Sequence, residues 1–251
     1  MGEYLKVTEF SNLLLALKER EQRNYVIHSS LLKFGVGMED VPQIYETLHD
    51  ILGDEATLAF PTFTLRKSLK PFDYKSSCDK TNGALSLYAQ KCKDGIRSKS
   101  LLHSYFLHSR GTKLVLPGDK VDRSFGEGSI FDYFLENDFQ VLLLGCNFQQ
   151  GATFVHHVER LANVYYRQDI TLDKEFIDNN GVVQKIPYRY YSRKSDFIKT
   201  NLKQFESDFC DTDFVRKVLF ENTESYSFSM KIASTFLINK LNQNPNYLLE
   251  S

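Results

Sequence analysis

Short continuous runs of apolar residues recur along the chain, and polar or turn-forming residues bound each of them. The segments "NYVIHSS" (24–30), "ATLAF" (56–60) and "QVLLLG" (140–145) each predict a buried strand, and "HSYFLH" (103–108) predicts another. Strands without polar alternation are usually covered on both faces. The pattern therefore predicts a sheet with helices on either side.

Between these runs, apolar residues recur three and four positions apart, which is the spacing of one helix face. Thr8 is predicted to cap the first such helix, and Asp40 the second, which Gly53 ends. Ser129, with Asp132 three positions on, is predicted to cap a short helix through "IFDYFLE". "GALSLYAQKC" and "SMKIASTFLINKL" predict two further helices. The residues that the last helix is expected to bury are Ile232, Phe236 and Leu237.

The alternation of buried strands with amphipathic helices favours an α/β fold, with a central mixed, largely parallel sheet flanked by helices. The segment "FIDNNGVVQKI" breaks this alternation, because Asn180-Gly181 between β-prone flanks is typical of a hairpin turn. We therefore expect an antiparallel hairpin inserted near residues 170–193. No linker, repeat or low-complexity segment is evident, so residues 1–251 are expected to form one domain.

Composition narrows the class of protein. A chain of 251 residues, 42% of them hydrophobic, can bury one substantial core. Its net charge of -1 offers no concentrated basic surface, so no nucleic-acid partner is expected. The apolar runs are too short to span a bilayer and "MGEYLKVTEF" lacks the features of a secretory signal, so no membrane association is expected. The four cysteines form no CxxC pair, which favours free thiols and a cytoplasmic location.

Three polar motifs follow predicted strands, where ligands bind in α/β folds. "IHSSL" ends the first strand, "PTFT" follows the second, and "GCNFQQGATFVHH" follows "QVLLLG". The loop "SFGEGS" (124–129) runs into a helix start, a kind of site whose backbone N–H groups suit phosphate. Each motif taken singly is more often a turn or a cap than a binding site.

The segment "FVHHVER" places His156 and His157 side by side, with Glu159 three positions after the first. Adjacent histidines on a helix point about 100° apart, and no HExxH pattern is present, so we expect no metal site. No GxSxG elbow or Walker sequence supports a serine hydrolase or a nucleotide hydrolase. His156 and Glu159 would share one helix face, where the carboxylate can orient the imidazole; a solvated pair is the competing interpretation.

The order of the motifs is more informative than any one of them. "VIHSSLLKFG", "TLAFPTFT", "PFD", "RSKSLLHS", "FGEGS", "VLLLG" and the His-x-x-Glu pair follow one another along the chain. The set resembles the aminoglycoside 3-N-acetyltransferase family, whose members transfer an acetyl group from acetyl-CoA to an amine of an amino sugar. The resemblance extends from about Tyr25 to the last predicted helix.

The resemblance implies roles for individual residues. His156 matches the family's catalytic histidine, which would take the proton of the amine, and Glu159 its carboxylate partner. The residues implied for the CoA site are Ser29, Ser30, Ser104, Phe125, Gly126 and Ser129. Those expected on the acceptor side are Thr62, Tyr166, Arg167 and Tyr190. Acetyl-CoA is the expected cosubstrate, a small amino sugar the expected partner, and a homodimer is compatible with the family.

The chain departs from the family pattern at two places that bear on function. Ser100 and Leu101 replace the His-Pro of the family's "RSxHPxxS" loop, and Ile130 replaces the proline of "FGxxSP". Tyrosines and arginines in "NVYYRQD" and "PYRYYSR" favour an anionic acceptor, such as a nucleotide-linked amino sugar for surface polysaccharide, unless they serve hairpin packing. The alternatives are a polycationic aminoglycoside, which would require clustered carboxylates, and a catalytically silent CoA-binding homologue.

Overall fold

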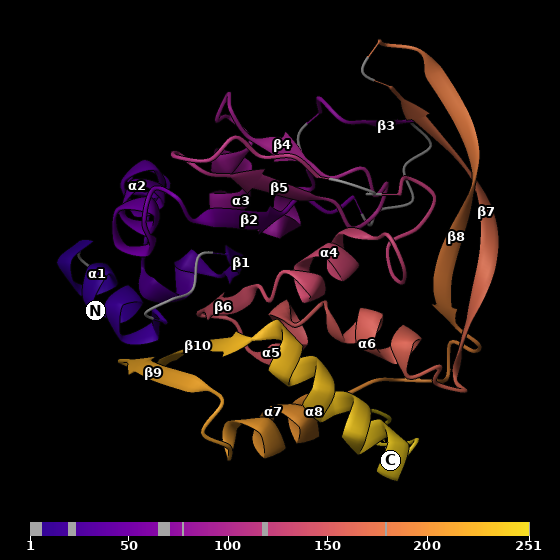
Figure 1. Ribbon diagram of the computed structural model, residues 1–251. Coiled ribbons are helices and arrows are strands. Elements are labelled where there is room, and N and C mark those ends of the chain that lie inside the picture. Colours follow the sequence, from indigo (N-terminus) through magenta and orange to yellow (C-terminus); the bar gives the residue numbers. More distant parts are fainter. Residues whose placement is uncertain are drawn as a thin grey trace.

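A seven-stranded sheet forms the centre of the computed structural model, which describes residues 7–19, 24–64, 71–76, 78–116, 120–178 and 180–250 (Figure 1). The strand order is β4-β5-β2-β1-β6-β10-β9. In that order the strands are β4 (Ile96–Arg97), β5 (Tyr105–His108), β2 (Thr57–Pro61), β1 (Asn24–Ser29), β6 (Gln140–Leu144), β10 (Thr223–Ser229) and β9 (Arg216–Phe220).

The sheet is mixed, as predicted, but its parallel part is confined to the three central strands. β1 is parallel to both β2 and β6, and the pairs β4·β5, β5·β2, β6·β10 and β10·β9 are antiparallel. The expectation of a largely parallel sheet is therefore wrong. Antiparallel neighbours need only short connections, such as the turn between Phe220 and Thr223, whereas parallel neighbours need a crossover.

Helices cover both faces of the sheet. One core cluster packs β1 and β2 against α1 (Val7–Leu17), α2 (Val41–Leu52) and α3 (Ala84–Ala89). The other core cluster lies under α4 (Ile130–Glu136), α5 (Phe148–Gly151), α6 (Val155–Leu161), α7 (Lys203–Cys210) and α8 (Met230–Gln243). Short 3₁₀ turns span Leu31–Phe34 and Lys80–Asn82. None of the helices in the described part of the chain is long and apolar enough to cross a bilayer.

Local sequence signals predicted some helix details and failed at others. The Oγ of Ser129 accepts the N–H of Asp132 at 3.3 Å, so the predicted cap of α4 is confirmed. Thr8 lies inside α1 rather than before it, so it is not the cap. Leu237 is buried in α8, as predicted, but Ile232 is 40% exposed because it lies on the solvent side of that helix.

Strand β10 was missed because one of its two buried faces is polar. Ser225 and Ser227 are fully buried between the neighbouring strands. The Oγ of Ser225 accepts the N–H of Gly145 at 3.1 Å, and the side-chain amide of Gln140 donates to the Oγ of Ser227 at 3.1 Å. Hydroxyl groups whose hydrogen bonds are satisfied in this way can be buried in a sheet without an apolar signature in the sequence.

The predicted hairpin is confirmed as β7 (Arg167–Ile177) and β8 (Val183–Arg193), with Asn180 and Gly181 in its turn. It runs along one side of the body and forms a second sheet with the short strand β3 (Phe72–Asp73) near its tip (Figure 1). Nearer its base, the N–H of Arg189 donates to the carbonyl of Asp122 at 2.8 Å. The hairpin therefore contacts the body through the loop that precedes α4.

Candidate active site

The three parallel strands end at the same edge of the sheet, and their polar motifs meet there. The N–H of Ser30, just after β1, donates to the carbonyl of Leu144 at the end of β6, at 2.8 Å. Gly145 has a φ of +67°, and a Cβ there would lie 2.9 Å from the ring of Phe34 and 3.1 Å from the carbonyl of Ser30. A glycine is thus required for β6 to end this close to the serine motif.

His156 and Glu159 lie on the same face of α6, as predicted from their spacing. The Nδ1 of His156 is 2.7 Å from Oε2 of Glu159. The His156 side chain is 35% exposed, whereas Glu159 is fully buried. Val155 and Val158 of the same helix pack in the core, so one helix presents the imidazole to solvent and the carboxylate to the interior. The interpretation of this pair as simply solvated is wrong for Glu159.

Two residues at the base of the hairpin hold Glu159 from its other side. The hydroxyl of Tyr166 donates to Oε1 of Glu159 at 2.9 Å. The Nε of Arg167 lies 2.8 Å from Oε2 of Glu159, so the two side chains form an ion pair. Arg167 Nη2 is also 3.0 Å from Nδ1 of His156. A buried carboxylate requires such partners, because an unpaired charge in the interior is costly.

The ionisation of Glu159 follows from these contacts. Burial by itself would raise the pKa of the Glu159 carboxyl, but the contacts with His156 and Arg167 outweigh burial and hold that pKa below its ordinary value. Glu159 is therefore a carboxylate at neutral pH. A carboxylate oxygen only accepts and a guanidinium only donates, so Nδ1 of His156 can hydrogen bond to Glu159 or to Arg167 but not to both. With the proton on Nδ1 the bond is to Glu159, and Nε2 is left unprotonated in the neutral ring.

His157 points away from this pair, as the sequence predicted. It is buried, and its Nδ1 accepts the N–H of Gly126 at 3.1 Å. Its ring stacks on Phe131, with the centroids 6.3 Å apart. Burial lowers the pKa of His157 to about 4, so the ring stays neutral and supports the loop before α4.

Two further histidines near the site were not singled out from the sequence. His103 and His156 contact Phe125 with ring centroids 4.9 and 5.7 Å apart, respectively. His28 lies next in this row of rings, beside Phe63 at 6.2 Å. His103 and His28 each immediately precede a serine of a motif used above, "LLHS" and "IHSSL", and this adjacency was the available signal.

Most residues predicted for the CoA site are buried and already hydrogen bonded. The hydroxyls of Thr62 and Ser104 are 3.0 Å apart, and Arg97 donates to Ser104 Oγ at 3.1 Å. Ser129 caps α4. Ser29 and Ser30 remain partly exposed at the sheet edge, and Phe125 is buried beside His156. The assignment of these residues to CoA stays a prediction.

The predicted acceptor residues are divided among three places, and Thr62 is buried beside Ser104 after β2. Tyr166 and Arg167 lie against Glu159. Tyr190 is 36% exposed on the hairpin, and none of the described contacts links it to Tyr166 or Arg167. Of the residues that depart from the family pattern, Ser100 is buried with its Oγ 3.4 Å from the hydroxyl of Tyr188. Ser100 thus packs under the hairpin rather than lining an exposed loop.

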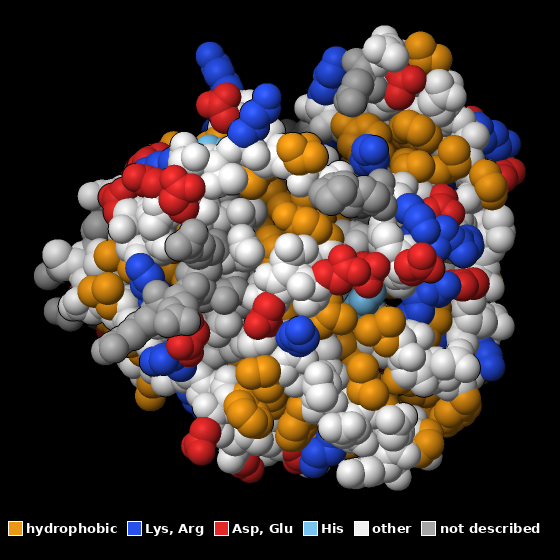
Figure 2. Space-filling model, in the orientation of Figure 1, with side chains coloured by type: hydrophobic (Ala, Val, Ile, Leu, Met, Phe, Trp, Pro, Cys, Tyr) orange, Lys and Arg blue, Asp and Glu red, His pale blue; other side chains and the backbone are white. Residues whose placement is uncertain are grey.

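The face that bears the site is chemically mixed. Figure 2 shows a histidine ring among acidic, basic and apolar side chains, over the region where α4, α6 and the hairpin meet in Figure 1. Within the described ranges, no group of three or more His, Cys, Asp or Glu side chains could hold a metal ion. The described arrangement supplies an oriented imidazole with a buried carboxylate behind it, which suits proton transfer.

Comparisons with known proteins agree on one family. A family model described as aminoglycoside 3-N-acetyltransferase matches residues 26–242. Among solved structures, the binary complex of AAC-IIIb with CoASH is 18% identical and has a TM-score of 0.80, covering 96% of this chain and 97% of that one. AAC(3)-IIb is 18% identical and has a TM-score of 0.82, and the match covers 97% of this chain and 98% of that one. The YokD protein of Bacillus subtilis is 16% identical and has a TM-score of 0.79, and the match covers 97% of this chain and 96% of that one. At these identities the structures establish a shared fold.

Proposed function

Because the chain belongs to the aminoglycoside 3-N-acetyltransferase family, we propose that it transfers an acetyl group from acetyl-CoA to a primary amine of an amino sugar. The observation that carries the proposal is the contact between His156 and the fully buried Glu159. Such a pair gives a base that faces solvent and a fixed carboxylate behind it. An amine that is protonated at neutral pH requires this kind of base before it can attack a thioester.

The proposed reaction is a direct transfer. Nε2 of His156 accepts a proton from the acceptor ammonium, and the amine nitrogen then attacks the thioester carbonyl carbon. As the C–S bond breaks, the CoA sulfur takes that proton from the imidazolium. The nitrogen loses its second proton in becoming an amide, and this proton passes through the neutral imidazole to solvent, so that one proton is released per turnover. Glu159 stays ionised throughout and stabilises the imidazolium. Cys146 has no part in this scheme, because burial raises the pKa of its thiol to about 11.

For the cosubstrate, we propose that the partly exposed Ser29 and Ser30 contribute to CoA binding at the sheet edge. Phe125 would form the apolar wall between the thioester and His156, since its ring contacts that histidine. Ser104, Thr62 and Ser129 would act by fixing the surrounding loops, because their hydroxyls are buried and engaged. Family membership supports this arrangement.

For the acceptor, an aminoglycoside is the first candidate, because the matched family is defined by that substrate class. The hairpin residues that favoured an anionic acceptor have other partners. Arg167 pairs with Glu159 and Arg189 with Asp122, and the Tyr188 side chain of β8 is buried against Leu101 and Leu102. A nucleotide-linked amino sugar remains the second candidate, favoured by a separate cationic cavity described in the next subsection.

The proposal is tested by measuring thiol release from acetyl-CoA with a panel of aminoglycosides and nucleotide-linked amino sugars. His156→Ala should lower kcat by roughly 10²–10⁴-fold, the contribution expected of a general base. Tyr165→Phe is the control, because its hydroxyl bonds only to Asn246 on the surface and its activity should match that of the native chain. An unchanged kcat in folded His156→Ala protein would exclude His156 as the base.

A further inference from the structure

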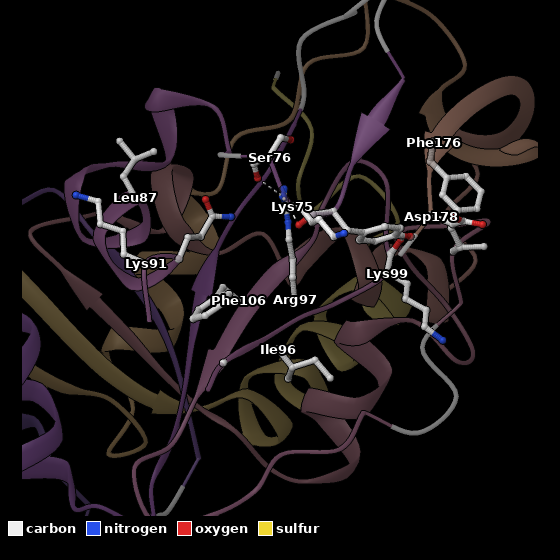
Figure 3. Close-up of a pocket in the computed structure, with 14 residues that line it drawn as sticks. Lys75, Ser76, Leu87, Lys91, Ile96, Arg97, Lys99, Phe106, Phe176 and Asp178 are labelled. Atoms are coloured by element: carbon white, nitrogen blue, oxygen red, sulfur yellow. Dashed lines mark hydrogen bonds between the residues drawn. The ribbon is translucent and has the colours of Figure 1, made fainter. Parts of the chain in front are cut away.

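A cavity of about 750 Å³ lies at the edge of the large sheet, away from the residues assigned to the reaction (Figure 3). Its floor is formed by β4 and β5, through Ile96, Arg97 and Phe106. Helix α3 forms one wall, and Phe176 and Asp178 at the tip of the hairpin form the opposite wall. The volume falls within the range of pockets that hold small ligands, roughly 300–1,000 Å³.

The charge of the cavity differs from that of the chain as a whole. Among the described residues that line it, four side chains are cationic and one, Asp178, is a carboxylate, although the net charge of the chain is -1. The cationic residues are Lys75, Lys91, Arg97 and Lys99. The Asp178 carboxylate accepts the N–H groups of Asn180 and Val182 within its own turn. The lining therefore favours an anion over a cation.

Arg97 lies at the centre of this lining, between Ser76 and Phe106 (Figure 3). Its acceptors are all neutral: its guanidinium donates to the carbonyl of Ser76 at 2.7 Å and to that of Thr62 at 2.8 Å, as well as to Ser104 Oγ. Burial lowers the pKa of Arg97 to about 10, so it remains charged at neutral pH. The charge of Asp73 acts on this half-buried cation, but no carboxylate in the described segments forms an ion pair with it, so an anion in the cavity would stabilise it.

The walls also offer flat apolar surface. Tyr74, Phe106 and Phe176 all line the cavity, and the rings of Tyr74 and Phe176 meet edge to face with centroids 5.9 Å apart. A ligand with a planar ring could stack against such side chains while its charge faces the lysines. Cations together with aromatic rings in one cavity are the chemistry that recognises a nucleotide.

We propose that this cavity binds the phosphate-bearing, ring-containing end of a nucleotide. The inference rests on the proposed acetyl transfer, which offers two sources of such a group. One is the adenosine nucleotide end of acetyl-CoA, and the other is the nucleoside diphosphate of a nucleotide-linked amino sugar. The shared chemistry is the same in both cases: a multiply charged phosphate next to a planar base.

A row of contacts joins the cavity to His156. Arg97 bonds to Ser104, and the residue before it, His103, contacts Phe125, whose ring contacts His156. Because Ser104, His103 and Phe125 are buried, a ligand anchored in the cavity would pass over them, along the carboxyl ends of β2 and β1, to place its reactive end beside the base. The cavity would hold the invariant part of the ligand, and His156 would meet the reacting atoms.

The first experiment measures nucleotide binding without turnover. Adenosine 3′,5′-bisphosphate and UDP are titrated calorimetrically into native protein, into Lys75→Glu/Lys99→Glu, and into the control Lys231→Glu on α8. The double variant should bind at least one probe roughly tenfold more weakly, and binding to native protein should weaken with added salt, because charges across an open cavity are screened. Lys231→Glu should bind as the native chain does, since its exposed side chain lies on α8. Equal binding by double variant and native chain, or no binding of either probe, overturns the proposal.

The second experiment identifies the source of the nucleotide. If the cavity holds the end of CoA, the double variant should raise KM for acetyl-CoA but not for acetyl-pantetheine, which lacks the nucleotide. If it holds the acceptor's nucleotide, KM should rise for the nucleotide-linked sugar alone. His156→Ala should lower turnover with either by roughly 10²–10⁴-fold and still bind the probes. Probe binding without any acetyl transfer by the native chain would refute the proposed function while leaving the cavity assignment intact.

Discussion

Glu159 is the residue on which the contacts of the site converge. His156 reaches it from the same helix, and Tyr166 and Arg167 reach it from the base of the hairpin. Glu159 is fully buried, so each of these partners offsets part of the cost of removing its charge from water. The position of the imidazole consequently depends on residues that belong to a different element.

Replacing Arg167 with alanine should lower the free energy of unfolding by roughly 3–5 kcal/mol, because it leaves a buried carboxylate without its cation. Urea denaturation measures this loss. Arg216→Ala is the matched control: Arg216 pairs with Glu19 at the surface, and its removal should cost less than about 1 kcal/mol. Comparable losses in the two variants would mean that the Glu159 contact does not stabilise the fold as a buried ion pair.

At the scale of elements, the hairpin is attached to the body through a small set of contacts. The hydroxyl of Tyr188 is 2.5 Å from Ser124 Oγ, which in turn is 2.7 Å from Nδ1 of His103. Arg189 pairs with Asp122 at 3.2 Å. These contacts link β8 to the loop before α4 and to a histidine beside the candidate site, so hairpin position and site geometry are coupled.

Tyr188→Phe should loosen this attachment, because it leaves the buried Ser124 and Ser100 hydroxyls with one fewer partner, at a cost of roughly 1–3 kcal/mol. Amide hydrogen exchange should become faster in β7, β8 and residues 120–129. Tyr190→Phe is the control, since the Tyr190 side chain is 36% exposed and none of the described hydrogen bonds involves its hydroxyl. Unchanged exchange in Tyr188→Phe would show that other contacts hold the hairpin.

Some elements were predicted correctly from the sequence, and others were missed. The hairpin turn at Asn180-Gly181 and the cap at Ser129 depend on neighbours within a few residues, and both were found in the sequence. Strand β10 was missed, and the sheet was expected to be largely parallel, because both depend on which strands pair. Ser225 is buried because β10 lies between β6 and β9, and the N–H of Gly145, far away in the sequence, donates a hydrogen bond to its hydroxyl.

At the scale of the whole molecule, the buried histidines make the fold less stable as the pH falls. Five of the six histidines are buried, with His156 as the exception. Burial lowers the pKa of His28, His49 and His157 to about 4 and that of His103 to about 3. His49 also faces His108, with Nε2 and Nδ1 3.0 Å apart, so the two rings cannot both be charged at low cost.

The free energy of unfolding should therefore fall as pH decreases from about 6.5, the ordinary pKa of histidine, towards 4. In that window the unfolded chain binds protons that the folded chain excludes, so each buried histidine lowers stability by up to about 1.4 kcal/mol per pH unit. Urea denaturation at pH 7.5, 6 and 5 measures the slope. His49→Gln should reduce that slope, whatever its effect at pH 7.5. Equal stability at pH 7.5 and 5 would contradict this account.

The sequence by itself determined what depends on order and short spacing. The ordered motifs identified the family, and the three-residue spacing of His156 and Glu159 placed them on one helix face. Helical geometry is local, so a spacing along the chain translates directly into a shared face. The same reasoning correctly turned His157 away from the pair.

Tertiary structure alone decided which distant residues complete the site. Tyr166 and Arg167, which are expected on the acceptor side, also contact Glu159, because the chain reverses after α6 and brings the first residues of the hairpin against that helix. The cationic cavity likewise exists only where the hairpin tip approaches α3 and β4. Such contacts join segments that no local pattern relates, since they follow from how the sheet, helices and hairpin pack together.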